Sequence, residues 1–206
     1  MSANVQELRQ HLREKFPEAH RGAVLQPPEE PRFGAAAFPA GTISELIPAD
    51  DGGLALWVAG LLSEADGPAD FPDFVLVDGG DAFDPASHSA AACSHLLWLR
   101  CSTLQEVLKA ADLLVRDGNV PFILLDLVHL PKASLRGIPA AQWWRLKQLC
   151  EKGGCRLVVL APFPLVPCAS LRLALSARLT LADFDLPRRE VLQRVTARTE
   201  RMRHAK

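Results

Sequence analysis

The sequence predicts an α/β domain of the doubly wound type, with a mostly parallel sheet and helices on both faces. Three runs, at residues 74–77, 121–126 and 156–160, consist mainly of Val, Leu, Ile and Phe. Strands that are apolar at consecutive positions are typical of parallel sheets, because both faces of such sheets are buried. Helical segments separate these runs, as the crossover connections of parallel strands require.

Periodicity, together with start and stop signals, predicts the other elements. A helix begins near Ser102 or Thr103, either of which forms a capping-box pattern with Glu106. Gly153 and Gly154 end the last long helix. In chain order the remaining elements are a strand at 42–47, a helix at 54–62, a strand at 95–99, helices at 102–116 and 140–151, and a strand at 177–181.

The chain is expected to have four parts. Residues 1–17 are predicted to form a short amphipathic helix, and its apolar stripe is Val5, Leu8, Leu12 and Phe16. A proline-rich linker (18–40), the α/β core (41–187) and a basic C-terminal tail (188–206) follow. The stripe either folds back onto its own core or docks on a neighbouring subunit, so its residues are candidate partner contacts.

The composition restricts the class of protein. With 206 residues, a net charge of −1 and 23% charged residues, the chain is large enough for a core and is neither disordered nor a polycation. No apolar run reaches the roughly 20 residues of a membrane span, and the N-terminus is unlike a signal peptide, so we expect a cytoplasmic protein. The five cysteines predict buried thiols rather than disulfides or a metal site.

Residues 41–56 have the outline of a phosphate-binding loop but lack the residues that bind phosphate. A strand leads into a turn with Gly52 and Gly53, and an apolar helix follows. The working loop needs a first glycine, and a lysine and a hydroxyl after its last glycine. With the pattern registered on Gly53, these places hold Pro48, Leu54 and Ala55. Since proline has no N–H and the other two bind neither phosphate nor metal, we expect no nucleotide cofactor.

The charges are unevenly distributed. Residues 45–84 include ten acids and no Lys or Arg, which disfavours a bound triphosphate. Residues 188–206 carry seven bases against two acids, and we expect a solvated helix end or a contact with nucleic acid or an acidic partner. The arginines of this tail are Arg188, Arg189, Arg194, Arg198, Arg201 and Arg203.

Three stretches resemble the core of the RecA-type ATPases. Residues 44–53 are similar to its strand and Walker A loop, and residues 122–126 to its Walker B strand. Residues 74–85 resemble its strand and acid followed by Ala-x-Asp-Pro, and the matching residues are Asp78, Ala82, Asp84 and Pro85. The resemblance covers roughly residues 41–160 and implies a RecA-like fold.

The chain departs from the RecA pattern at the residues that carry its chemistry. In that pattern a glutamate two places after the strand aspartate polarises the attacking water, and here that place is Gly80, with Asp81 one residue late. Asp126 stands at the Walker B place, where the resemblance implies magnesium binding. Carboxylates without lysine, hydroxyl and water-activating acid cannot assemble phosphoryl transfer. We therefore expect Asp78 and Asp126 to be vestigial and the chain not to be an enzyme.

A RecA-like core of this length, with an amphipathic N-terminal helix and a degenerate loop, resembles the ImuA group. The resemblance implies an accessory protein of bacterial DNA-damage tolerance, active in translesion synthesis and the SOS-type response, that contacts an ImuB-like polymerase homologue or RecA. A SulA-like division inhibitor and a DNA-binding RecA-fold protein with residual nucleotide binding are alternatives, and a homo-oligomer stays open. Trp143 and Trp144 are further partner candidates, because neighbouring helix positions face about 100° apart and one indole should stay near the surface.

Overall fold

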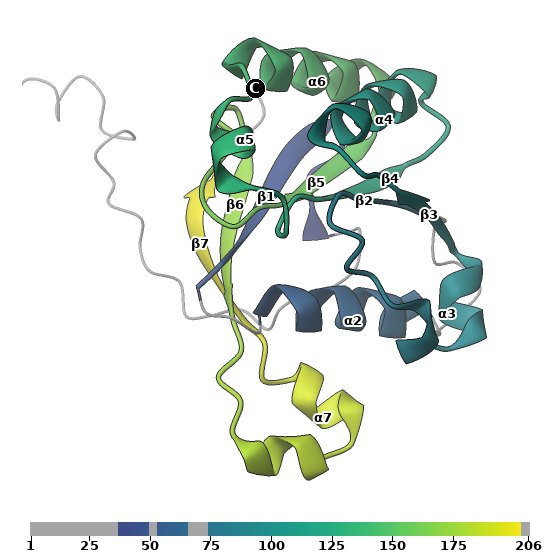
Figure 1. Ribbon diagram of the computed structural model, residues 1–206, viewed down its shortest axis with the longest axis vertical. Coiled ribbons are helices and arrows are strands. Elements are labelled where there is room, and N and C mark those ends of the chain that lie inside the picture. Colours follow the sequence, from purple (N-terminus) through teal and green to yellow (C-terminus); the bar gives the residue numbers. More distant parts are fainter. Residues whose placement is uncertain (1–36, 50–52, 66–73, 203–206) are drawn as a thin grey trace, which may run out of the picture.

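The computed structural model describes residues 37–49, 53–65 and 74–202, and within them a seven-stranded sheet forms the central layer (Figure 1). The strand order is β3-β2-β4-β5-β1-β6-β7. Strands β1 to β6 are parallel, and β7 runs antiparallel to β6. The strands are β1 (Thr42–Pro48), β2 (Phe74–Asp78), β3 (Leu96–Arg100), β4 (Phe122–Asp126), β5 (Arg156–Leu160), β6 (Leu171–Ser176) and β7 (Thr196–Met202).

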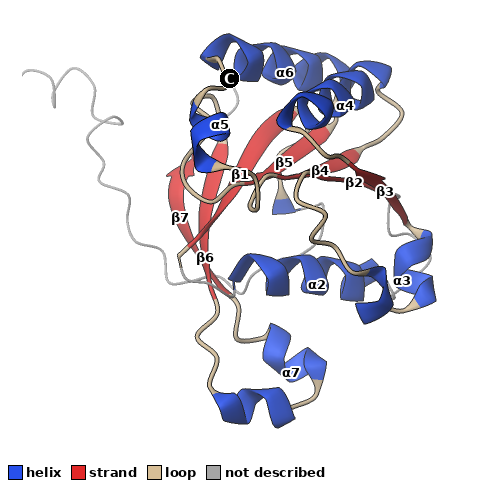
Figure 2. Ribbon diagram, viewed as in Figure 1, coloured by secondary structure: helices blue, strands red, loops and turns tan. Residues whose placement is uncertain are grey.

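Helices cover both faces of the sheet, which confirms the doubly wound α/β prediction (Figure 2). One face carries α2 (Gly53–Ala65) and α3 (Ala90–Ser94), and the other carries α4 (Leu104–Asp117), α5 (Lys132–Arg136) and α6 (Ala140–Gly153). The connection from β6 to β7 projects beyond α2 and contains η3 (Leu181–Asp185) and α7 (Arg188–Leu192). The described helices include none that is long and apolar enough to cross a membrane.

Two apolar clusters, one on each face of the sheet, hold the layers together. In β4, Ile123 and Leu125 pack with residues of α4 and α6, whereas Phe122 and Leu124 pack with residues of α2. Because both faces are buried, the strand is apolar at consecutive positions, which is the pattern that predicted it. All five cysteines are free thiols, and three of them are buried.

Helices α4 and α6 begin and end within two residues of the predicted positions, whereas α2 extends three residues beyond its predicted end. The Thr103 hydroxyl accepts a hydrogen bond from the Glu106 N–H, and the Glu106 carboxylate accepts one from the Thr103 N–H, so the capping box of α4 is complete. Gly118 follows α4 and Gly154 follows α6, with φ of 74° and 71°. Glycine adopts this left-handed conformation without the steric cost that a side chain imposes.

The prediction of a strand at residues 177–181 is wrong. The structure places β6 five residues or more earlier, at Leu171–Ser176, and residues 181–185 form η3. The prediction misses β6 because Arg172 interrupts its apolar residues. In the sheet the guanidinium of Arg172 is paired with the buried carboxylate of Glu45 in β1, so the charge is compatible with a strand position.

The helical expectation for the basic tail is correct for its first five residues and wrong for residues 196–202. Residues 188–192 form α7, and β7 then adds to the sheet. The side chains of β7 are exposed or partly buried on both faces, so the strand lacks the apolar alternation that identifies a half-buried strand. Residues 196–202 therefore belong to the same sheet as the core.

The predicted N-terminal helix (1–17) lies outside the described residues, and so does the linker up to residue 36. The last residues of the predicted linker belong to the core instead. The Phe38 side chain is 2% exposed. Its ring lies edge-on to Trp57 at a centroid distance of 5.7 Å and stacks on Phe122 at 6.1 Å. Such aromatic packing fixes the entry of the chain into β1.

Candidate functional site

The carboxyl ends of β1, β2 and β4 lie at one edge of the sheet, where open α/β folds bind their ligands. Pro48 ends β1, Asp78 ends β2 and Asp126 ends β4. Asp78 and Asp126 are register partners in the β2–β4 pair, so the two carboxyl-bearing residues are neighbours across adjacent strands. The sequence-predicted carboxylates are thus brought together.

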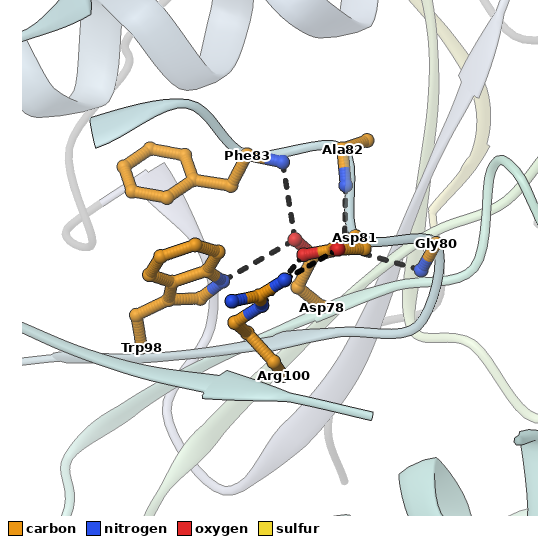
Figure 3. A network of polar contacts seen from close by, with 7 residues as sticks. All are labelled: Asp78, Gly80, Asp81, Ala82, Phe83, Trp98 and Arg100. Atoms are coloured by element: carbon orange, nitrogen blue, oxygen red, sulfur yellow. Dashed lines mark hydrogen bonds and ion pairs between the residues drawn. The ribbon is translucent and has the colours of Figure 1, made fainter. Parts of the chain in front are cut away.

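Asp78 is fully buried, and its carboxylate holds the loop that follows β2 (Figure 3). One oxygen accepts hydrogen bonds from the N–H groups of Gly80 (3.1 Å) and Ala82 (3.2 Å). The other accepts from the Phe83 N–H (3.0 Å) and the Trp98 indole N–H (3.2 Å). A carboxylate has about four acceptor positions. Four donors therefore occupy the capacity that a metal or a water would use.

Asp126 closes a local turn after β4. Its Oδ1 accepts a hydrogen bond from the Val128 N–H at 2.9 Å. Burial raises the pKa of this carboxyl to about 6, an increase that the Val128 N–H opposes and the nearby charge of Asp78 adds to. Among the described residues neither Asp78 nor Asp126 forms an ion pair, and no cluster of three or more His, Cys, Asp or Glu side chains is arranged for a metal.

The two glycines after β2 pack tightly against the loop after β4. A Cβ atom built on Gly80 would lie 2.6 Å from the Cβ of His129, and one on Gly79 would lie 2.9 Å from the carbonyl oxygen of Asp126. The Gly79 N–H donates to that same oxygen at 3.0 Å. Position 80 is where the RecA pattern has its water-activating glutamate. No side chain fits there unless His129 moves.

Asp81 points to the strand next to β2 instead. Its carboxylate accepts two hydrogen bonds from the Arg100 guanidinium, at 2.7 and 2.6 Å, and these bonds lower the pKa of Asp81 (Figure 3). The same guanidinium lies 5.2 Å from the centre of the Trp98 ring, and Phe83 meets that ring edge-on at 5.3 Å. Sequence reasoning identified neither Trp98 nor Arg100, because their contacts join neighbouring strands 19 and 20 residues apart.

Two of the residues at the predicted loop positions, Gly53 and Leu54, serve packing. A Cβ atom on Gly53 would lie 2.7 Å from the carbonyl carbon of Leu175, so α2 approaches β6 more closely than any side chain allows. Leu54, at the lysine place, is buried in the apolar cluster over α2, and Ala55, at the hydroxyl place, is exposed. Gly52 lies outside the described residues.

Comparison with solved structures decides the fold type. The crystal structure of the RadB recombinase superposes on this chain with a TM-score of 0.51 and 13% sequence identity, over 69% of this chain and 78% of that chain. The fold is RecA-like. No protein-family model matches the chain, and no curated protein matches it in sequence. The RecA-like relationship is therefore one of architecture, and the chemistry has to be argued from the residues above.

The RecA-like core places the two candidate tryptophans differently. Trp143 is 1% exposed and packs under α6, whereas Trp144 is 44% exposed, as the helical geometry predicts for adjacent residues. The ammonium of Lys147 lies 5.5 Å from the centre of the Trp144 ring. The N-terminal candidates Leu8, Leu12 and Phe16 lie outside the described residues.

The arginines of the predicted tail are dispersed over the RecA-like core and the β6–β7 connection. Arg188 donates to the carbonyl oxygen of Ser87, and Arg194 lies 3.4 Å from the Asp183 carboxylate. In β7, Arg198 pairs with Glu200 at 3.0 Å and Arg201 donates to the carbonyl oxygen of Pro167 at 2.9 Å. The side chain of Arg189 and all of Arg203 lie outside the described part. The described arginines thus do not form one helical array.

A buried ion pair on the sheet was not foreseen from the sequence. Glu45 of β1 is fully buried, and its Oε2 lies 2.6 Å from Nε of Arg172 in β6. Its Oε1 accepts from the N–H groups of Leu165 (2.6 Å) and Val166 (2.9 Å). The ion pair could have been predicted from the single acid inside an apolar strand, because a buried charge requires a partner.

The helices α4 and α6 leave a groove of about 570 Å³ along their seam. Leu108 and Leu146 line it with apolar surface, and an ion pair of 2.9 Å between Arg145 and Asp112 crosses it. None of the strand-end residues lines this groove, so it is separate from the candidate site at the strand ends.

Proposed function

We propose that this chain is a non-catalytic RecA-like accessory protein of bacterial DNA-damage tolerance that acts through protein contacts. The observation that carries the proposal is the packing of Gly80 against His129, because it fills the space of the water-activating side chain. The bonding of Asp78 supports the same conclusion, since its acceptors hold the chain's own loop.

Phosphoryl transfer depends on clustered positive charge and on metal ions that neutralise the phosphates. The described strand ends offer the opposite, a pair of neighbouring acids, Asp78 and Asp126. Leu54 in the lysine place is committed to the core. The proposal therefore assigns the chain neither a nucleotide cofactor nor a catalytic metal.

The role in damage tolerance rests on two likenesses. Residues 78–85 resemble the RecA pattern of acid and Ala-x-Asp-Pro, and a solved structure with this fold is described as a recombinase. We propose as partner an ImuB-like polymerase homologue, RecA, or both. The exposed indole of Trp144 is the described side chain best suited to anchor such a contact, since buried tryptophans dominate many interfaces.

Two measurements test this proposal on the full chain. Calorimetric titration with magnesium-ATP should show no binding, and a magnesium-dependent dissociation constant in the micromolar range would contradict the non-catalytic assignment. Affinity capture with purified ImuB-like protein and with RecA should show association with at least one of them. Trp144→Ala should weaken that association about tenfold or more, whereas the matched variant Leu113→Ala, on exposed surface of α4, should not.

A further inference from the structure

The connection between β6 and β7 ends in an exposed apolar turn. The connection projects beyond α2, and η3 lies at its far end (Figure 1). Leu181 of η3 is 89% exposed, more than any other large apolar side chain in the described residues, and Ala182 beside it is exposed as well. A single exposed apolar residue is ordinary on a protein surface, so its surroundings decide whether it is suited to a contact. We call residues 180–186 the tip.

The tip is held in shape by its own hydrogen bonds. The carboxylate of Asp183 accepts from the N–H group and the hydroxyl of Thr180, at 2.7 and 2.8 Å. The Asp183 N–H donates to the carbonyl oxygen of Thr180 at 3.0 Å, and the Leu186 N–H donates to that of Asp183 at 3.2 Å. Arg194 lies 3.4 Å from the same carboxylate and ties the turn to the returning chain. A preformed turn loses little conformational entropy when it binds.

The groove between α4 and α6 has the complementary chemistry. Apolar side chains line its floor, and its walls carry two cations, Lys109 and Arg145, against one acid, Asp112. The Oδ2 atom of Asp112 already accepts hydrogen bonds from Arg116 at 2.6 Å and from Arg145 at 3.0 Å. The walls therefore keep an excess of positive charge, and an apolar segment with acidic neighbours fits this groove best.

The tip matches the groove in charge and in backbone conformation. Residues 180–186 contain two acids, Asp183 and Asp185, and no Lys or Arg. Asp185 is exposed, one turn away from Leu181. The backbone groups of α4 and α6 are bonded within their own helices, so an extended segment would find no backbone partners in the groove. A helical turn needs none, because it bonds internally.

A chain cannot place the tip in its own groove. The groove lies on the face of the sheet that α4 and α6 cover, whereas the connection extends past α2 on the opposite face (Figure 2). The sheet thus separates the two surfaces within one molecule. The groove that receives the tip belongs to another molecule, and every copy of this chain presents both surfaces.

We propose that copies of this chain associate head to tail, with the tip of one copy docked in the α4–α6 groove of the next. Leu181 then meets the apolar floor, and Asp185 lies near the cations of the walls. Such a contact is heterologous, so it adds further copies until a ring closes or a chain grows. One helical turn buries less than the roughly 1,200–2,000 Å² of a stable interface, so the association is weak and depends on concentration. The proposal is independent of the proposed function, because it uses neither Trp144 nor the strand ends.

Sedimentation equilibrium of the full chain over about a hundredfold range of concentration tests the proposal, and the average mass should rise above that of the monomer. Leu181→Ser removes the apolar group of the tip, and Ala141→Trp fills the groove from an exposed wall position. Each variant should weaken the association about tenfold or more. The matched controls are Met202→Ser, at an exposed apolar residue of β7, and Ala140→Trp, at an exposed position outside the groove, and both should associate as the wild type does.

A mixture of the two variants separates this contact from a symmetric one. Leu181→Ser keeps an intact groove and Ala141→Trp keeps an intact tip, so one productive contact remains between one copy of each. The mixture should form heterodimers and nothing larger, although each variant alone stays monomeric at the same concentration. An isologous interface that used either residue would not produce this result. A wild-type monomer at all concentrations, association that neither variant weakens, or a mixture without heterodimers overturns the proposal.

Discussion

Asp126 is a carboxyl at the end of a buried strand, and its surroundings set its protonation. Its carboxyl is held by the Val128 N–H, and burial raises its pKa to about 6 from an ordinary value of 3.8. A carboxyl with a raised pKa binds more protons in the folded chain than in the unfolded one. It therefore contributes stability that is present below about pH 4 and lost as the pH rises through 6.

This linkage predicts the effect of Asp126→Asn. The amide oxygen still accepts from the Val128 N–H, while the buried charge is removed. At pH 7.5 we expect the variant to be more stable than the wild type by about 1–3 kcal/mol, because each unit of pKa shift corresponds to about 1.4 kcal/mol. Urea unfolding followed by circular dichroism measures the difference.

The pH dependence distinguishes this explanation from a packing effect. The stability gap should shrink between pH 6 and pH 4, where the wild-type carboxyl becomes protonated in the folded chain. A gap that is constant over this range contradicts the role of the charge. Asp185→Asn, at an exposed position, is the control and should change stability little at either pH.

At the residue scale the sequence shows which residues of the RecA pattern are absent, but it does not show which side chains occupy their space. The absence of a glutamate at position 80 is visible in the chain itself, because the pattern from Asp78 to Pro85 fixes the register. The His129 side chain that fills the space is 49 residues away and reaches it through the pairing of β2 with β4. The Glu45–Arg172 pair was missed for the same reason.

At the element scale, Asp78 acts as the anchor of the loop that follows β2. One oxygen serves the N–H groups of Gly80 and Ala82, and the other serves the Phe83 N–H and the Trp98 indole. The loop thereby uses the acceptor positions of the carboxylate that a ligand would otherwise need. Its conformation therefore depends on a side chain at the end of the strand as well as on its own glycines.

Two substitutions at Asp78 should separate these contacts. Asp78→Ala leaves four donors without an acceptor, and we expect a loss of stability of about 3–5 kcal/mol. Asp78→Asn keeps one acceptor oxygen, which can serve one pair of donors. Hydrogen exchange should then show lost protection either at the amides of Gly80 and Ala82 together or at the amide of Phe83. The amides that bond to the retained oxygen should stay protected.

The control for this experiment is Asp84→Asn in the same loop. Asp84 is exposed and accepts from the Ala86 N–H and the Ser87 hydroxyl at the start of η2 (Pro85–Ser87). Its replacement should leave the amides of Gly80, Ala82 and Phe83 protected. Equal loss of protection in both variants contradicts the anchoring role of Asp78.

Elements with a strong local signal were predictable, and those that depend on a partner strand were not. The sequence alone was sufficient to predict the apolar strands β2, β4 and β5 and the capping box of α4, because burial on both faces and capping leave local sequence patterns. β6 and β7 carry arginines whose partners lie elsewhere in the fold. Their strand character follows from pairing with β1 and with each other.

At the scale of the whole molecule, the described residues from Phe38 to β7 pack around one sheet. Phe38 is packed between Trp57 and Phe122, at the start of the described chain. At the other end, six register pairs join β7 to β6, and Leu192 and Val195 of the connection are buried. The sheet therefore requires residues that the sequence alone assigned to a linker and to a tail.

Truncation tests this view. A chain that ends at Pro187 loses β7 and the buried Leu192 and Val195, so we expect its cooperative thermal transition to disappear or its stability to fall by at least about 3 kcal/mol. The full chain with Arg198→Gln and Arg201→Gln removes the charges but keeps the strand, and it should stay cooperatively folded. A truncated chain with the wild-type melting temperature would show that residues 188–206 are a separate tail.

The contact between Gly53 and Leu175 changes how related sequences should be interpreted. Glycine is required at this position because α2 crosses β6 at a distance that leaves no room for a methyl group. An invariant glycine here is expected in any homologue that keeps this packing, with or without a nucleotide. A motif search that counts this glycine toward a Walker signature therefore counts a packing requirement, and the residues at positions 54 and 55 are the ones that discriminate a phosphate-binding loop.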